Sequence, residues 1–212
     1  LTGAGRGFCA GGDIKASSDR ARKTRETVEQ RAESIRQHSQ TTIALNQMPK
    51  ITIALINGAA AGAGLTLALA CDLRIAVSSA VLKTAYAQIA LAGDLGISYF
   101  LTRLVGPSKA RELMLFNEKL SAEQALQMGL VNRIVEQPGL TGETLELVEK
   151  LAKGPSVAFG YMKLNLLLAE SGSLEQVIEQ EAINSAHCVR TRDVKEAAIA
   201  FREKRQPKFE GR

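Results

Sequence analysis

The sequence predicts an α/β fold over residues 1–138, followed by a helical extension over residues 139–212. Two short apolar runs rich in β-branched residues, 51–56 and 73–77, flank a stretch at 65–71 that is apolar on every side. This order of strand, helix and strand is typical of a parallel α/β layer. Aromatic residues make up 4% of the chain and tryptophan is absent, so the core is expected to be aliphatic and rich in alanine.

The first elements can be assigned from the spacing of apolar residues and from the glycines that mark turns. Leu1 to Gly3 look like the end of a strand that runs into a glycine-rich loop, and no initiator methionine precedes them, so we expect an N-terminal truncation. Residues 19–47 are strongly charged with sparse apolar positions, which predicts a long and largely solvated helix. The buried strand at 51–56 follows, and a turn rich in glycine and alanine leads from it into the buried helix.

Helix start signals dominate the second half of the chain. Pro107 with Ser108 suits a first turn, and Gly129 is expected to end a helix before a short strand at 131–135. The other starts combine a capping residue with Glu or Gln three positions later, or place proline in the first turn: Ser121 with Gln124, Pro155, Ser173 with Gln176, and Asp193 with Glu196. The last helix carries an apolar stripe of Val194, Ala197, Ala198 and Phe201.

Charge and cysteine content exclude several classes of protein. The net charge of +5 suits an anionic ligand, but the basic runs at 20–25 and 204–212 contain a single aromatic residue, Phe209, and no stacking platform, so we expect no nucleic-acid partner. The three cysteines form no CxxC pair, which argues against a disulfide framework or a metal site and favours a reducing cytoplasm. No apolar run reaches the roughly 18 residues of a membrane span, and no signal-peptide pattern opens the chain.

The first glycine loop covers residues 3–13. It fails as a dinucleotide fingerprint, because Phe8 stands where a third glycine is required, and no phosphate-loop lysine follows. Taken alone, its glycines are equally well explained by a tight turn. The second loop, residues 57–64, leads directly into the buried helix, where unpaired N–H groups favour an anion or oxyanion. Close packing of the helix on a strand explains its small residues equally well.

The two loops are more informative together. Each follows a strand in an α/β layer, so we expect both to lie at the same carboxyl edge, where ligand sites gather. Two backbone N–H groups from separate loops then converge on one oxygen, which is the arrangement that stabilises an enolate or a tetrahedral oxyanion.

Four strings carry a resemblance along essentially the whole chain: FCAGGDIK at 8–15, NGAAAGAGLTLALACDLRIA at 57–76, SAEQALQMGLVNRIV at 121–135 and AFREKRQPKFEGR at 200–212. On these the sequence resembles the enoyl-CoA hydratase/isomerase (crotonase) superfamily, and it is closest in pattern to epoxyphenylacetyl-CoA isomerase-like members. The resemblance implies a spiral of ββα units with a C-terminal helical trimerisation extension, and a homotrimer or hexamer. It also implies an acyl-CoA thioester substrate with no cofactor besides the coenzyme A of that substrate.

The resemblance also assigns roles to individual residues. It implies oxyanion donors at the backbone N–H groups of Gly12 and Ala63. It places further contacts to the substrate and its CoA moiety at the positions around the two loops, which are Ala10, Gly12, Asp13, Ile14, Lys15, Gly62 and Ala63. In relatives, basic residues near the C-terminus contact the CoA 3′-phosphate of a neighbouring subunit. Here Lys204, Arg205 and Lys208 occupy that region, and a solvated chain end is the favoured explanation for them.

The acid and base residues depart from the hydratase pattern. Hydratases of this family use two glutamates to activate water, and the matching positions here hold Thr66 and Tyr86. Neither side chain can act as a carboxylate base. Asp94 lies where epoxyphenylacetyl-CoA isomerases place an acid/base aspartate, and its other interpretation is a helix N-cap. His38 and His187 have no Ser or Cys at a nucleophile elbow and so build no triad, and Cys9 beside the first loop is expected to serve packing.

Three functions therefore compete. The leading one is an enoyl-CoA isomerase, in which Asp94 moves a proton between two carbons while Gly12 and Ala63 hold the thioester oxygen. The second is an enoyl-CoA hydratase in which Asp94 alone activates water. The third is a non-catalytic acyl-CoA-binding member.

Overall fold

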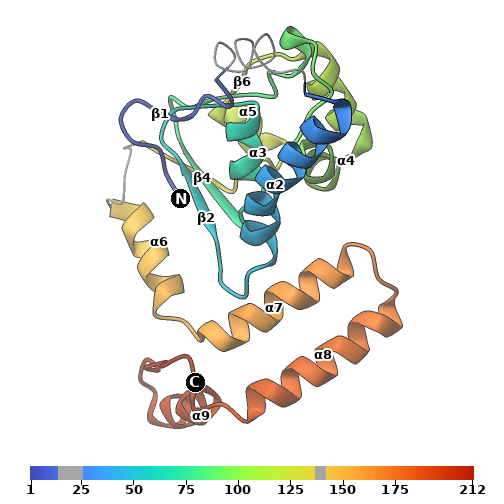
Figure 1. Ribbon diagram of the computed structural model, residues 1–212. Coiled ribbons are helices and arrows are strands. Elements are labelled where there is room, and N and C mark those ends of the chain that lie inside the picture. The colour runs from blue at the N-terminus through green and yellow to red at the C-terminus, as the bar shows by residue number, and fades with distance from the viewer. Residues whose placement is uncertain (14–25, 137–141) are drawn as a thin grey trace. The chain divides into compact units, whose positions relative to one another are not determined.

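The computed structural model of the protein describes residues 1–13, 26–136 and 142–212 and divides them into two compact units (Figure 1). Unit 1 comprises the described part of residues 1–46 and 52–141, and unit 2 comprises residues 47–51 and 142–212. The α/β elements lie in unit 1, and the helices of the extension lie in unit 2. The functional domain boundary between residues 138 and 139 stays a prediction.

Unit 1 contains two sheets where the sequence suggested one layer. The first is a parallel three-stranded sheet in the order β2, β4, β7, formed by Ile53–Ile56, Leu73–Val77 and Arg133–Val135. The second has the order β1, β3, β5, β6, formed by Gly7–Cys9, Ala59–Ala61, Val81–Lys83 and Leu120–Ser121, and only β5 and β6 pair antiparallel. The predicted α/β class and parallel strand order are confirmed.

Strand β3 is the main departure from the predicted elements, because it lies inside the segment 57–64 that we expected to be a turn. Three consecutive alanines show neither alternation nor β-branched side chains, so no local signal marks them as a strand. The pairing is fixed instead by neighbours on both sides, since β3 lies between β1 and β5.

The helices of unit 1 follow the predicted signals closely. They are α2 at Val28–Gln47, α3 at Ala63–Leu69, the short 3-10 helix η1 at Ala87–Ile89, α4 at Ile97–Phe116 and α5 at Ala122–Gln127. Helix α3 is buried as expected, and Ser121 with Gln124 forms the predicted capping box. Within α4, Gly106 leaves helical geometry with φ 75°, so Pro107 begins a second helical segment. Of the helix predicted at 19–47, residues 19–25 lie outside the described part of the chain.

The core of unit 1 is aliphatic, as the composition predicts. Ile56, Leu65, Ile75, Leu82 and Leu101 are among its largest fully buried side chains. Buried alanines on β2, β3 and α3 allow these elements to approach closely. Across the described ranges, no helix is long and apolar enough to cross a membrane.

Unit 2 consists of α6 at Gly142–Ala152, α7 at Ser156–Ala169, α8 at Leu174–Val189 and α9 at Arg192–Glu203. The predicted capping box of Ser173 with Gln176 starts α8. The predicted start of α9 at Asp193 is wrong, because Thr191 is the N-cap and accepts a hydrogen bond from the Val194 N–H. Asp193 is instead buried, and its carboxylate accepts hydrogen bonds from the N–H groups of Glu210 and Gly211 at 2.8 and 3.0 Å.

Candidate active site

The two glycine loops meet because β1 and β3 are neighbouring parallel strands. Gly7 pairs with Ala59 and Cys9 with Ala60, so the segments that follow each strand leave the sheet at the same edge. The expected common carboxyl edge is therefore present. The strand responsible is β3, however, and not the predicted strand at 51–56, which lies in the other sheet as β2.

Two glycines permit this close approach. A Cβ atom at Gly64 would overlap the carbonyl group of Cys9, which belongs to β1. A Cβ atom at Gly11 would lie 2.8 Å from the Ala61 carbonyl oxygen and 3.4 Å from the Ala63 nitrogen, and Gly11 has a φ of +90°. The packing explanation of these glycines is therefore correct, and the same packing brings the first loop against the peptide of Ala63.

The steric role of Gly64 gives a stability prediction. Gly64→Ala should lower the free energy of unfolding by about 3 kcal/mol, because the new methyl group meets backbone atoms that cannot rotate away. The matched control is Gly12→Ala, since a Cβ atom there has nothing within 4 Å. Urea unfolding of both variants measures the difference, and equal midpoints would contradict the packing role of Gly64.

The Ala63 N–H lies at the first position of α3, where no partner exists within the helix. Its N-cap Gly62 has φ 54° and ψ −126°, a conformation open mainly to glycine, and donates its own N–H to the Lys83 carbonyl at 3.1 Å. This bond to β5 holds the Ala61–Gly62 peptide, which immediately precedes the peptide that carries the Ala63 N–H. Because α3 is one short helix, the donor matters here as an individual N–H group rather than through a large helix dipole.

Asp94 lies in the loop between η1 and α4, and its side chain does not cap that helix. The N-cap of α4 is Gly96, which makes no side-chain cap, so the N-cap interpretation of Asp94 is wrong. The carboxylate instead accepts a hydrogen bond from the Tyr86 hydroxyl at 2.7 Å. The next residue, Leu95, has a φ of 54° and its carbonyl accepts from Thr42 on α2 at 2.8 Å, which ties the loop to a neighbouring helix.

Thr66 and Tyr86, where the resemblance to hydratases would place glutamates, contact each other beside Asp94. The Thr66 hydroxyl lies 3.2 Å from the Tyr86 hydroxyl and 3.1 Å from the Gly62 carbonyl oxygen, to which it can donate. Thr66 is fully buried and Tyr86 is 4% exposed. Burial raises the pKa of the Tyr86 phenol well above its ordinary value and the negative charge of Asp94 adds to this, whereas the hydrogen bond with Thr66 acts in the opposite direction. Tyr86 is therefore a neutral donor at physiological pH.

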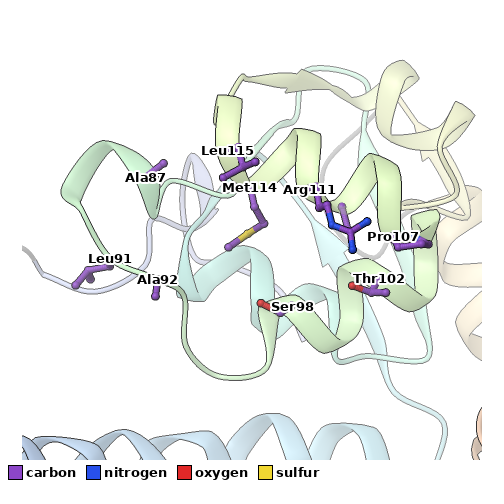
Figure 2. A pocket seen from close by; sticks show the side chains of 10 residues that line it. Ala87, Leu91, Ala92, Ser98, Thr102, Pro107, Arg111, Met114 and Leu115 are labelled. Atoms are coloured by element: carbon purple, nitrogen blue, oxygen red, sulfur yellow. The ribbon is translucent and has the colours of Figure 1, made fainter.

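A cavity of about 410 Å³ lies beside the Asp94 loop (Figure 2). Segment 87–92 and the two segments of α4 line it, and the side chains in Figure 2 are mostly apolar, with Arg111 as the cationic exception. The Met114 Cε atom lies 3.4 Å from the position that a Cβ atom would take at Gly93, so the cavity approaches the residue before Asp94. Asp94 itself does not line it. No sequence signal indicated this cavity, because its wall depends on the break in α4 at Gly106.

The other residues named from the sequence lie as follows. Ala10, Gly12 and Asp13 are in the segment after β1, whereas Ile14 and Lys15 lie outside the described residues. Cys9 packs against the core beside the loop. His38 contacts the Ser34 carbonyl of its own helix, and His187 stacks on Tyr161 in unit 2. Within the described ranges, no group of three or more His, Cys, Asp or Glu residues could hold a metal ion.

The C-terminal basic residues are partly engaged within unit 2. Arg205 forms an ion pair with Glu196 at 2.6 Å and another with Glu203 at 2.6 Å. Lys204 ends α9 in a left-handed conformation. The backbone N–H of Lys208 donates a hydrogen bond to the Glu196 carboxylate at 2.8 Å. Through these two ion pairs Arg205 ties the chain end to helix α9.

Comparison with known proteins gives consistent matches. Residues 1–212 match the family described as enoyl-CoA hydratase/isomerase. The chain is 35% identical to the 1,2-epoxyphenylacetyl-CoA isomerase of Escherichia coli K12 and 35% identical to a probable enoyl-CoA hydratase of Rhodobacter capsulatus, in both cases over 100% of this chain and 80% of the relative. The crystal structure of an enoyl-CoA hydratase from Polaromonas sp. JS666 superposes with a TM-score of 0.90 at 33% identity, covering 99% of this chain and 80% of that one.

Proposed function

The chain belongs to the enoyl-CoA hydratase/isomerase family and is an enzyme of that family, and on this premise we propose that it shifts a double bond in an acyl-CoA thioester. The observation that carries the proposal is the hydrogen bond between Tyr86 and Asp94, which holds one carboxylate beside two residues that are not glutamates. The relative named 1,2-epoxyphenylacetyl-CoA isomerase supports the choice of an isomerase.

The proposed reaction needs one base and one oxyanion site. The N–H groups of Gly12 and Ala63 hold the thioester oxygen, and the Asp94 carboxylate removes a proton from the α carbon of a 3-enoyl thioester. The C–H bonding pair enters the π system, and the resulting enolate oxygen is stabilised by the two N–H groups. The carboxylic acid then returns the same proton to the γ carbon, which gives the conjugated 2-enoyl thioester. No atom is gained or lost, so no co-reactant is required.

Hydration makes a different demand on the site. A water molecule must lose a proton to one group while the α carbon gains one, which is the reason for two carboxylates in the hydratase pattern. The Thr66 hydroxyl donates a hydrogen bond but does not act as a general acid or base at physiological pH, and Tyr86 is held neutral by its raised pKa. The relative named a probable enoyl-CoA hydratase nevertheless supports a second candidate, in which Asp94 alone activates water. A non-catalytic acyl-CoA-binding role is the third candidate.

Two assays separate these candidates. The purified protein is expected to convert a 3-enoyl-CoA into the conjugated 2-enoyl-CoA, followed by the absorbance of the conjugated thioester, and to hydrate crotonyl-CoA much more slowly. Robust hydration that persists in Asp94→Asn would overturn the isomerase proposal. Binding of acyl-CoA without either conversion, at any chain length, would favour the non-catalytic member.

The substrate contacts follow the same proposal. Ala10, Gly12 and Asp13 in the first loop, together with Gly62 and Ala63 in the second, are proposed to contact the acyl-CoA. Ile14 and Lys15 are proposed to extend this surface along the CoA moiety. The coenzyme A of the substrate is then the only organic cofactor-like group that the reaction uses. The cytoplasmic location expected from the cysteines stays a prediction.

The proposed homotrimer or hexamer finds support on helix α9. The predicted apolar stripe of Val194, Ala197, Ala198 and Phe201 lies on the exposed face, and Phe201 is 86% exposed. An adjoining face of α9 is already covered, because Asp193 and Ala200 are buried. An aromatic side chain this exposed beside an apolar stripe fits a subunit contact better than a water-facing surface.

This surface gives a prediction for assembly. Phe201→Asp should convert the oligomer to monomer at micromolar concentration, because a carboxylate cannot be buried in an apolar contact without a partner. Light scattering during size-exclusion chromatography measures the mass. Lys195→Glu on the same helix is the control, since it adds negative charge away from the stripe. An unchanged mass for Phe201→Asp would place the subunit contact elsewhere.

A further inference from the structure

We propose that Tyr86 and Thr66 are positioning residues that connect the Asp94 carboxyl group to the peptide of the oxyanion donor Ala63. This inference rests on the proposed roles of Asp94 and Ala63 and goes beyond them, because it couples the base to the oxyanion site. Tyr86 and Thr66 would then serve the isomerase reaction through Asp94 and the Ala63 peptide.

Three contacts form a continuous row that runs from the half-buried Asp94 to the fully buried Thr66. The Asp94 Oδ1 atom lies 2.7 Å from the Tyr86 hydroxyl, which lies 3.2 Å from the Thr66 hydroxyl, which lies 3.1 Å from the Gly62 carbonyl oxygen. The last atom in the row, the Gly62 carbonyl oxygen, connects it to the proposed oxyanion donor. The Gly62 carbonyl and the Ala63 N–H belong to one planar peptide unit, so a bond to the first polarises the second.

The number of protons decides how this row is connected. When Asp94 is ionised, only the hydroxyl protons of Tyr86 and Thr66 are available for three contacts. Tyr86 donates to the carboxylate, and the single proton of Thr66 serves either Tyr86 or Gly62. When Asp94 carries a proton, three protons serve three contacts. All bonds can then run in one direction, from Asp94 to Tyr86, from Tyr86 to Thr66 and from Thr66 to Gly62.

The state with Asp94 protonated is the one that exists at the enolate intermediate of the proposed reaction. Asp94 then holds the substrate proton on Oδ1, the carboxyl oxygen that faces Tyr86, while the thioester oxygen carries the enolate charge. In that state the Thr66 hydroxyl donates to the Gly62 carbonyl, which strengthens the Ala63 N–H as a donor to the oxyanion. The backbone N–H of Thr66 also donates to the Gly62 carbonyl at 3.0 Å, and this helix bond is present in both states. When the proton returns to carbon, Asp94 is ionised again and Tyr86 again donates to its carboxylate.

The surroundings of the row favour this behaviour. Burial disfavours the tyrosinate form of Tyr86. Among the described residues, Asp94 is the ionisable side chain whose charge affects the pKa of this phenol. The phenol proton therefore remains available in both states of Asp94. Hydrogen bonds between buried hydroxyl groups are also worth more than the same bonds in water, because solvent does not compete for them.

The test compares Tyr86→Phe, Thr66→Val and the double variant in the isomerisation assay over a range of pH. Tyr86→Phe removes a donor to the ionised carboxylate, so the acidic limb of the rate profile should move up by about one pH unit, with kcat about tenfold lower and KM within about twofold. Thr66→Val should lower kcat by about fivefold through the oxyanion peptide, with a smaller pH change. Because both break one row, the double variant should be no slower than about twice Tyr86→Phe.

Controls make the result specific to the row. Tyr161→Phe and Thr144→Val remove the same hydroxyl groups in unit 2 and should leave kcat and the pH profile unchanged. Thr66→Ser retains the hydroxyl and should restore most of the kcat lost in Thr66→Val, and this pair carries the test if Tyr86→Phe fails to fold. Unchanged kcat and pH profiles in Tyr86→Phe and Thr66→Val, with Asp94→Asn inactive, would overturn the coupling alone. Full activity in Asp94→Asn would instead overturn the proposed function.

Discussion

Asp94→Asn is expected to lower kcat for double-bond migration by about three orders of magnitude, with little change in KM. The amide keeps the shape of the carboxylate and can still accept a hydrogen bond from Tyr86, but it cannot take a proton from carbon at useful pH. General acid–base catalysis contributes roughly 10² to 10⁴ in rate, and the reaction proposed here has a single group to supply it.

The measurement is steady-state kinetics with a 3-enoyl-CoA, accompanied by thermal unfolding of the variant. Asp94→Glu is the informative companion, because it keeps the carboxylate and moves it by one methylene group. It should retain a measurable fraction of the activity. If Asp94→Asn lost activity only through a large increase in KM, the carboxylate would bind substrate and would not be the base.

Ala63→Pro is expected to lower kcat by about 10² to 10³, because it deletes one of the two proposed oxyanion donors. Proline is unusually suited to this test, since it is favoured at the first position of a helix and its missing N–H makes no bond there. The folded structure should therefore survive while the donor is lost.

Ala63→Gly is the matched control for this substitution, because it also changes the side chain but keeps the N–H. Its kcat should stay within about threefold of the unaltered enzyme. Thermal unfolding of both variants monitors the fold. Comparable kcat values for Ala63→Pro and Ala63→Gly would show that the Ala63 N–H does not stabilise the oxyanion.

Local signals in the sequence predict those elements that have a strong local reason to form. The β-branched segments that become β2 and β4 are one example, and the buried helix α3 is another. The capping boxes at Ser121 and Ser173 are formed as predicted because both partners lie within one turn. Asp193 shows the limit of that reasoning, since a capping residue also stands at Thr191 and the distant backbone of Gly211 binds the Asp193 carboxylate.

The arrangement of the candidate site is harder to predict than its members. Pattern and resemblance indicated Thr66, Tyr86 and Asp94, but not that they form one row of hydrogen bonds. The path from Tyr86 to Asp94 passes through η1, the left-handed Ala90 and Gly93 at φ 107°, and no periodicity describes such a path. Its shape depends on contacts with other elements, among them the bond from Thr42 to Leu95.

The burial of Thr66 constrains how this protein and the two-glutamate enzymes can be interconverted in evolution. Thr66→Glu alone would introduce a carboxylate at a fully buried position, next to a tyrosine already committed to Asp94. Two carboxylates would then compete for one phenol proton, and burial would favour the protonated form of the introduced acid. A lineage that moves between the two chemistries must therefore change positions 66, 86 and 94 together or pass through a poorly active intermediate.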